Sequence, residues 1–262
     1  MLDRSWRIFA TGLSFVLFGL FALVLGVLLG LLVFPLPASA ARKERWTRRV
    51  IQGALWLYVR TMRFLGLLTF DISGQENAVQ TDASRGTLVI ANHPSLLDVV
   101  FLLSAIPNVN CIVKAALWRN PFTYFIVTLA GFIRNDREDM LEVAGAQIRS
   151  GQRLLVFPEG TRTADPEQLD LKRGSAHAAI AGGGHFTPVI IRCEPLTLRK
   201  HEAWYEVPPT PPHFSLKILP GQHIDDCIDT SKPRPVQVRR LTDYWKQLFE
   251  RNLGLGKHST GS

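Results

Sequence analysis

Residues 86–98 read GTLVIANHPSLLD, an apolar run that ends in a short polar segment. Short apolar runs of this kind are typical of strands that are buried on both faces of a parallel sheet. His93 and Asp98 come directly after the run, at the strand end where open α/β sheets bind their ligands. The two residues cannot face each other on one straight helix, where facing side chains are three or four positions apart. Across a turn that enters a helix, however, Asp98 can hold one ring nitrogen of His93 and leave the other as a free base.

The sequence around this run alternates between short apolar runs and longer helical segments. Further strands are expected at 110–113, 132–134, 153–157, 187–192 and 214–219, and helices at 96–105, 121–130, 137–150, 174–181 and 236–253. This alternation predicts an α/β fold in which helices flank a largely parallel sheet on both faces. The proline-rich stretch 208–212 is expected to be a stiff extended loop.

A second polar cluster, FPEGTR at 157–162, ends the strand expected at 153–157. It places a carboxylate, a glycine, a hydroxyl and a guanidinium at one turn: Glu159, Gly160, Thr161 and Arg162. Arginine is suited to bidentate capture of a phosphate or carboxylate. Lys172 follows, just before a helix whose N-terminus favours anions. From the residues alone, a polar loop with a surface ion pair between Glu159 and Arg162 is an equally open reading.

Residues 8–41 contain no charged side chain. About 20 apolar residues suffice to cross a hydrocarbon core of about 30 Å, so this stretch predicts an N-terminal membrane helix. The alternative is a cleaved signal peptide, because the small residues 38–40 resemble a cleavage site. The apolar stretch is longer than the roughly 7–15 residues of a signal peptide, which favours an anchor.

Basic residues follow the apolar stretch between Arg42 and Arg49, and the positive-inside rule then places the remainder of the chain in the cytoplasm. Segment 42–70 is basic and then amphipathic. It is expected either to lie in the membrane interface or to bury its apolar stripe inside the domain. The sequence therefore predicts a membrane anchor at 1–41, an interface segment at 42–70, an α/β domain at 71–253 and a flexible tail at 254–262.

The composition limits the partners of the chain. Its 262 residues are 47% apolar, which excludes disordered and fibrous classes, and 30 basic against 22 acidic residues give a net charge of +8. The positive charge fits anionic lipid headgroups, and without a nucleic-acid motif we expect no nucleic-acid partner. Cys111, Cys193 and Cys227 are widely spaced, so neither a disulfide framework nor a metal site is expected.

The two polar clusters together carry a resemblance. NHPSLLD and FPEGTR resemble the first and third signature blocks of the glycerolipid acyltransferase family, the lysophospholipid acyltransferases typified by 1-acylglycerol-3-phosphate acyltransferase. GFIRNDR at 131–137 resembles the second block, and TPVII at 187–191 resembles the fourth, centred on Pro188. The resemblance covers residues 86–192, and four blocks in order are more specific than one.

The resemblance implies a membrane-associated O-acyltransferase of phospholipid biosynthesis at the inner, cytoplasmic membrane. His93 would be the general base and Asp98 would orient it, so that a hydroxyl of a lysophospholipid, in the first place 1-acylglycerol-3-phosphate, attacks the thioester of acyl-CoA or acyl-carrier protein. Neither cofactor nor metal is implied. The acceptor and its phosphate would be bound by residues of the later blocks: Glu159, Gly160, Thr161, Arg162, Lys172, Pro188, and either Arg134 or Arg137.

Three alternatives to this function stay open. The family commonly has hydrophobic residues where Arg134 and Asn135 stand, and 194–212 has no counterpart that we can match, so the enzyme could serve a specialised lipid pathway with another acceptor. A membrane-bound hydrolase could use Ser95 as its nucleophile, although the chain contains no G-x-S-x-G motif. A non-enzymatic membrane adaptor is the third alternative, and it would tolerate the loss of His93.

Overall fold

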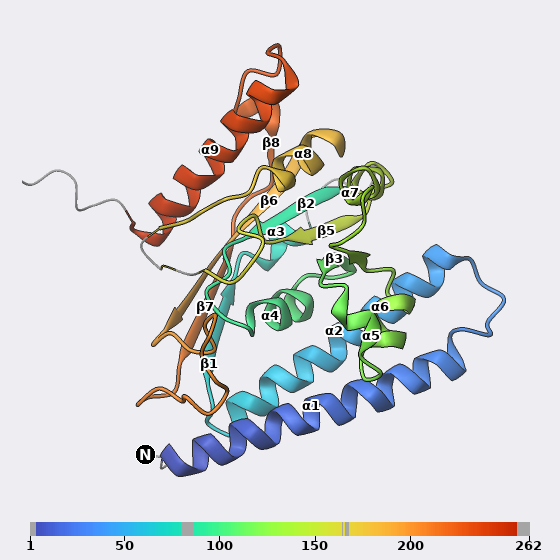
Figure 1. Cartoon of the computed structure of the whole chain (residues 1–262), viewed down its shortest axis with the longest axis vertical. Coiled ribbons are helices and arrows are strands. Elements are labelled where there is room, and N and C mark those ends of the chain that lie inside the picture. The colour runs from blue at the N-terminus through green and yellow to red at the C-terminus, as the bar shows by residue number, and fades with distance from the viewer. Residues whose placement is uncertain (1–3, 80–85, 164, 166–167, 256–262) are drawn as a thin grey trace, which may run out of the picture.

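The computed structural model describes residues 4–79, 86–163, 165 and 168–255 (Figure 1). Within these residues one sheet has the strand order β1-β7-β6-β2-β5-β3-β4, with β8 beside β6. The strands are β1 Thr69–Ser73, β2 Thr87–Ala91, β3 Val109–Val113, β4 Ile133–Arg134, β5 Arg153–Val156, β6 His185–Glu194, β7 His213–Ile218 and β8 Gln222–His223. The helices are α1 Arg4–Leu32, α2 Ala40–Phe64, α3 Gln75–Val79, α4 Asp98–Ala105, α5 Ala116–Arg119, α6 Tyr124–Leu129, α7 Met140–Arg149, α8 Gly174–Ala181 and α9 Arg234–Leu253, with a 3₁₀ turn at Ile224–Asp226.

The centre of the sheet is parallel. Strands β6, β2, β5, β3 and β4 pair in parallel, whereas β7 and β8 run antiparallel to β6, and β1 pairs in parallel with β7. The predicted α/β fold with a largely parallel sheet is therefore confirmed.

Strand β2 explains why the apolar run at its centre is continuous. All of its residues are buried. Leu88 and Ile90 pack into the core beneath α7, α8 and α9, whereas Val89 and Ala91 pack into the core shared with α2 and α4. Because successive side chains of a strand point to opposite faces, a strand covered on both sides must be apolar throughout. Figure 1 shows the two helical layers on opposite sides of the sheet.

Several element boundaries differ from the sequence-based expectation. The helix expected at 121–130 is shortened to α6, and the short helix α5 before it was not expected. Asn120 between them is extended, with φ −90° and ψ 118°, because the following Pro121 disfavours a helical conformation of the residue before it. Strand β1 begins at Thr69, two residues before the expected start of the α/β domain at 71. Its partner β7 lies far along the chain, so local pattern gave no signal for β1.

Helices α1 and α2 form an antiparallel pair beside α4 and α6 (Figure 1). Among the described residues, α1 is the one helix long and apolar enough to cross a membrane. Its buried positions, which recur every three or four residues through most of its length, are Arg7, Ala10, Ser14, Ala22, Gly26 and Leu29. One face of α1 thus contacts the domain, and the opposite face is exposed and apolar.

The basic cluster at the start of α2 is divided between two roles. Arg42, Arg45 and Arg49 are exposed, as expected for contact with lipid headgroups. Arg48 is instead buried and donates to the carbonyl of Ala130 at 2.7 Å and to the Gln152 side chain at 2.8 Å. Arg48 therefore fixes α2 to the domain and does not face lipid headgroups. The tail predicted at 254–262 lies outside the described residues beyond Leu255.

Candidate active site

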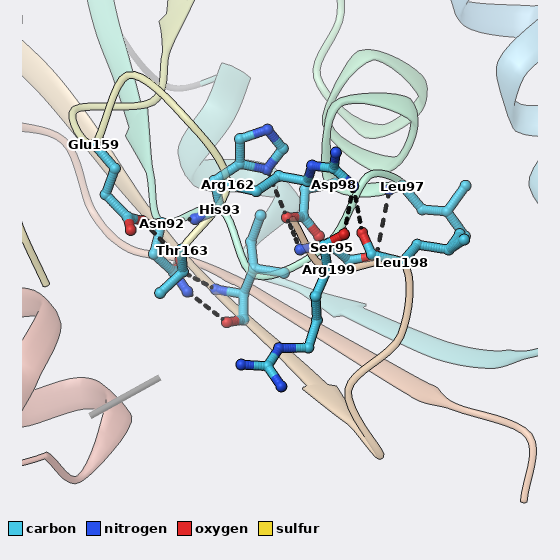
Figure 2. Close-up of polar contacts among 11 residues, drawn as sticks. Asn92, His93, Ser95, Leu97, Asp98, Glu159, Arg162, Thr163, Leu198 and Arg199 are labelled. Carbon is cyan, nitrogen blue, oxygen red and sulfur yellow. Dashed lines mark hydrogen bonds and ion pairs between the residues drawn. The ribbon is translucent and has the colours of Figure 1, made fainter. Parts of the chain in front are cut away.

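The topology brings the two polar clusters together. Strands β2 and β5 are parallel neighbours, with Ile90 paired to Val156, so the loops that follow them leave the same edge of the sheet. His93 lies in the loop after β2, which we call the catalytic loop (residues 92–97). Glu159 lies in the loop after β5. Figure 2 shows the side chains of both loops converging in front of α4.

His93 and Asp98 form the predicted pair. Nδ1 of His93 lies 2.9 Å from Oδ2 of Asp98, and the same oxygen accepts the backbone N–H of Ser95 at 2.7 Å. Asp98 is fully buried, and this burial raises the pKa of its carboxyl, while the hydrogen bonds from His93 and Ser95 act in the opposite direction. The ionised form of Asp98 is the one that fixes Nδ1 of His93 as a proton donor.

The other ring nitrogen of His93 is available for chemistry. No described residue forms a hydrogen bond with Nε2 of His93, and the side chain is 15% exposed. The ring stacks on Phe157, with the ring centroids 4.0 Å apart and 17° between their planes. A neutral imidazole held in this way presents an unprotonated nitrogen at a fixed position, as a general base requires.

Glu159 links the two loops rather than facing open solvent. It is buried, and its Oε1 accepts the backbone N–H of His93 at 3.0 Å and the hydroxyl of Thr163 at 2.9 Å. The backbone N–H of Thr163 in turn donates to the carbonyl of His93 at 2.7 Å. Burial raises the pKa of the Glu159 carboxyl. The side chain of Glu159 thus fixes the backbone of His93.

Asn92 is a positioning residue that the sequence analysis did not single out. Its side-chain amide donates to the carbonyl of Ile191 in β6 and accepts the backbone N–H of Ile191, both at 2.8 Å. These bonds fix the residue before His93 to a third strand. The available signal was a polar amide at the end of a fully buried strand, where an unpaired amide would be costly.

Arg162 lies beside the catalytic pair, and part of its guanidinium is already engaged. Nη1 of Arg162 donates to the carbonyls of Leu198 at 2.7 Å and Arg199 at 2.9 Å. No described residue bonds Nε or Nη2. The charge of Arg162 acts on Asp98 and favours its ionised form. Arg162 therefore braces a neighbouring loop and keeps donors for a ligand.

The remaining residues of the third block lie around the same turn. Gly160 has φ +70°, a conformation that favours glycine, and its N–H donates to the carbonyl of Phe157 at 2.9 Å. Thr161 is exposed. The backbone N–H of Lys172 donates to the carbonyl of Pro158 at 2.7 Å, and its exposed ammonium pairs with Asp170.

The structure does not bring Arg134 and Arg137 to His93. Arg134 belongs to β4, three strands from β2 in the sheet order and therefore about 14 Å away at about 4.8 Å per strand. Both arginines are exposed, and each pairs with a carboxylate two residues further on, Asp136 at 2.8 Å and Asp139 at 2.7 Å.

Pro188 is buried within β6, where it pairs with Ile90 of β2. Strand β7 pairs with β6 from Val189 onward, and β8 pairs with it up to Phe186. The proline, which has no N–H to donate, thus falls between the two antiparallel partners. This position explains how a central strand accommodates a proline. Pro188 therefore lies within the sheet and not at the surface of the site.

Ser95 is unsuited to the role of a nucleophile. It is fully buried, and its hydroxyl accepts the backbone N–H of Leu97 at 3.4 Å. This placement removes the basis of the hydrolase alternative. Within the described part of the chain, no group of three or more histidine, cysteine, aspartate or glutamate side chains is arranged to hold a metal ion.

Comparison with known proteins decides the family. An acyltransferase family model matches residues 69–192. A 1-acyl-sn-glycerol-3-phosphate acyltransferase of Limnanthes alba is 30% identical over 279 aligned positions, which cover 99% of this chain and 90% of the relative. The chain belongs to the acyltransferase family. An enzyme of the same name from Saccharomyces cerevisiae is 32% identical over 153 positions, covering 53% of this chain and 49% of that one.

The fold of the acyltransferase agrees with a solved structure. The crystal structure of PlsC, described as the 1-acyl-sn-glycerophosphate (LPA) acyltransferase from Thermotoga maritima, superposes with a TM-score of 0.74 at 20% identity. The match covers 99% of this chain and 100% of that one. Family membership makes the protein an enzyme that transfers acyl groups, so the adaptor alternative is also set aside.

Proposed function

We propose that this acyltransferase moves a fatty acyl group from the thioester of acyl-CoA or acyl-carrier protein to the free hydroxyl of 1-acylglycerol-3-phosphate. The observation that carries the reaction class is the His93–Asp98 pair: a buried carboxylate holds Nδ1 of His93, and no described residue bonds to Nε2. The names of the relatives support this acceptor. The residual donors of Arg162 beside His93 offer charge-assisted bonds to its phosphate.

The proposed reaction follows from this geometry. Nε2 of His93 takes the proton of the acceptor hydroxyl as the hydroxyl oxygen attacks the thioester carbonyl. The carbon–sulfur bond then breaks, and the departing thiolate receives the proton from His93. Asp98 stabilises the transient imidazolium and keeps the ring in one orientation. A positioned base of this kind contributes about 10²–10⁴ to the rate, and fixing both substrates contributes further.

A thioester is already an activated acyl group. The proposed reaction therefore requires neither a covalent enzyme intermediate nor a resident metal or cofactor. CoA and acyl-carrier protein are both anionic, and each would be attracted by the net charge of +8. We keep both as candidate donors.

We also propose that α1 and the outward face of α2 attach the enzyme to the bilayer in which its acceptor lies. The exposed face of α1 is apolar along its length, with Phe9 at 62%, Val16 at 59% and Leu31 at 67% exposure. Arg42, Arg45 and Arg49 flank this face and suit the anionic headgroups of the cytoplasmic leaflet. Extraction by carbonate, compared with extraction by detergent, tests whether the attachment is integral. An N-terminus that begins at Ala41 in the mature protein would favour the signal-peptide alternative.

The decisive experiment is a matched panel of lysolipids incubated with the purified protein and a labelled acyl thioester. We expect transfer to 1-acylglycerol-3-phosphate to exceed transfer to lysolipids with other headgroups and to monoacylglycerol. Preference for another headgroup would favour the specialised-lipid alternative, and release of free fatty acid without acceptor would indicate a hydrolase. The control is His93→Ala, which should lower kcat by about 10²–10⁴ with little change in the melting temperature.

A further inference from the structure

The connection between β6 and β7, residues 195–212, is built as an ordered loop, which we call the β6–β7 loop. Its backbone forms internal hydrogen bonds, from Glu202 to Arg199 at 3.2 Å, from Glu206 to Ala203 at 3.1 Å and from Val207 to Tyr205 at 2.9 Å. The loop therefore has a defined shape, although the sequence gave no counterpart for it in the family. Figure 1 places it, in orange, beside the first turns of α1 and the end of α2.

The tip of this loop exposes two large aromatic side chains. Trp204 is 49% exposed and Tyr205 is 55% exposed, and their rings meet edge to face with centroids 5.6 Å apart. Tryptophan and tyrosine are the residues enriched where a protein meets the membrane–water interface, because each has an apolar body and a polar handle. Lys200 and His201 are exposed in the same loop and suit the headgroup region.

The tip is seated on the apolar helix α1. The ring of Trp204 lies over Gly12, so closely that a Cβ there would come within 2.7 Å of it. Phe9 and Val16, one turn before and after Gly12, are exposed. A second contact joins the same elements, since Nη2 of the buried Arg7 donates to the carbonyl of Pro209 at 2.6 Å. The aromatic tip thus extends the apolar surface of α1.

The start of the loop is attached to the active site. The carbonyl of Leu198 accepts the backbone N–H of Leu96 at 3.2 Å. It also accepts Nη1 of Arg162 at 2.7 Å (Figure 2). Leu96 belongs to the catalytic loop, and the Leu198 side chain is buried in the core next to α4. One ordered segment therefore reaches from the exposed surface of α1 to the backbone around His93.

We propose that Trp204 and Tyr205 insert into the interface of the lipid bilayer beside α1, and that the β6–β7 loop thereby fixes the position of the catalytic loop relative to the membrane surface. The occupant is lipid rather than a protein partner, because the exposed rings continue the apolar face of a helix long enough to cross a membrane. The inference rests on the proposed attachment of α1 to a bilayer. It adds a second membrane contact, connected to the site.

The test is the depth of a fluorescent label on the full chain in vesicles of phosphatidylcholine with a minor share of phosphatidylglycerol. Cys227→Ser provides the background, because Cys111 and Cys193 are buried and burial raises the pKa of each thiol to about 12. A nitrobenzoxadiazole label is placed on Tyr205→Cys. The matched control is Arg239→Cys on α9, across the sheet from α1 (Figure 1).

We expect the label at position 205 to shift to the blue, to be quenched by doxyl lipids and to be protected from iodide. The label at position 239 should show the opposite behaviour. A label at 205 that is quenched by iodide as strongly as the control overturns the membrane contact, even if α1 keeps the protein on the vesicle. A protein that does not bind vesicles at all overturns the attachment through α1 as well.

An activity comparison tests the connection to the site. Trp204→Ala should lower transfer to an acceptor embedded in vesicles by about tenfold and leave transfer to a short-chain acceptor below its critical micelle concentration unchanged. Trp204→Phe should recover part of the loss. An equal loss with both acceptors would mean that Trp204 only packs against Gly12, and it would overturn the proposed coupling between membrane and site.

Discussion

Two edges of the same sheet carry the family's sequence blocks, and they differ in how firmly their polar residues are fixed. The side chains of Asn92, Asp98 and Glu159, which follow β2 and β5, are buried. Asn92 and Glu159 bond to the backbone of other segments, and Asp98 bonds to the ring of His93 and to the backbone N–H of Ser95. At the β4 edge, Arg134 and Arg137 are exposed, and each pairs with a carboxylate two residues away. Arg134 also lies over the ring of Trp118. Buried polar groups that are held by hydrogen bonds keep a fixed geometry, whereas exposed ion pairs contribute little to stability. The catalytic edge should therefore respond far more strongly to substitution.

Asp98→Asn should have the largest effect at the catalytic edge. An amide can donate to Nδ1 of His93 and so favour the tautomer in which Nε2 is protonated, and we expect kcat to fall by about 10²–10⁴. Activity and the melting temperature, measured on the same preparation, check this prediction.

Stability should change in the opposite sense from activity in the Asp98→Asn variant. Burial raises the pKa of the Asp98 carboxyl in the folded protein above its pKa in the unfolded chain. The carboxyl therefore contributes stability below the unfolded pKa, and this contribution is lost as pH rises through the folded pKa. Asparagine removes this dependence, so near pH 7 the melting temperature should be equal to or above that of the wild type. A variant that loses activity only because it unfolds would contradict this account.

Arg162→Ala should have the next largest effect, because Arg162 both supports the β6–β7 loop and keeps donors for the acceptor. A charge-assisted bond to phosphate is worth about 1.5–3 kcal/mol, so the KM for a phosphate-bearing acceptor should rise by about 10- to 150-fold. Arg162→Lys should recover part of this loss, because it keeps the charge without the planar fork. Steady-state kinetics with lysophosphatidate and with monoacylglycerol separate the roles. Equal losses with both acceptors would show that Arg162 acts only through Leu198 and Arg199.

Glu159 offers a matched pair of substitutions that sharpens the comparison. Glu159→Gln retains an oxygen that can accept the N–H of His93, so we expect kcat/KM within about threefold of the wild type. Glu159→Ala leaves buried donors unpaired and should lower kcat/KM by about 10- to 100-fold. The measurement is kcat/KM for both variants at one pH. A large loss in Glu159→Gln would indicate that the charge itself takes part in binding or chemistry.

Arg134→Ala and Arg137→Ala should have the smallest effects. Because both ion pairs are exposed and lie at the β4 edge, we expect less than about a threefold change in kcat/KM for either variant and little change in the melting temperature. The double variant controls for one arginine replacing the other. A rise in the acceptor KM of more than about tenfold would show that the substrate extends across the sheet to this edge, and the contrast between the two edges would be lost.

The sequence by itself determined the α/β class with its largely parallel sheet, the pairing of His93 with Asp98 and the presence of an apolar N-terminal helix. The apolar run at 88–91 required burial on both faces, and the spacing of His93 and Asp98 allowed a pair only across a turn. Both are local properties of the chain. The helix at 174–181 was likewise predicted with its observed bounds, because this segment is rich in alanine, a strong helix former, and contains no proline.

Only the tertiary structure decided which polar residues hold the site and which lie apart from it. Glu159 and Arg162 could have formed a surface ion pair, yet each bonds to a different segment of backbone. Pro188 fits within β6 because β7 pairs with β6 only from Val189 onward and β8 only up to Phe186. Arg48 is buried and donates to the carbonyl of Ala130. The position of the β6–β7 loop is set by its contacts with Gly12 and Leu96, which lie far from it in the sequence. Such contacts depend on which strands become neighbours, and no local pattern of charge or hydrophobicity records that.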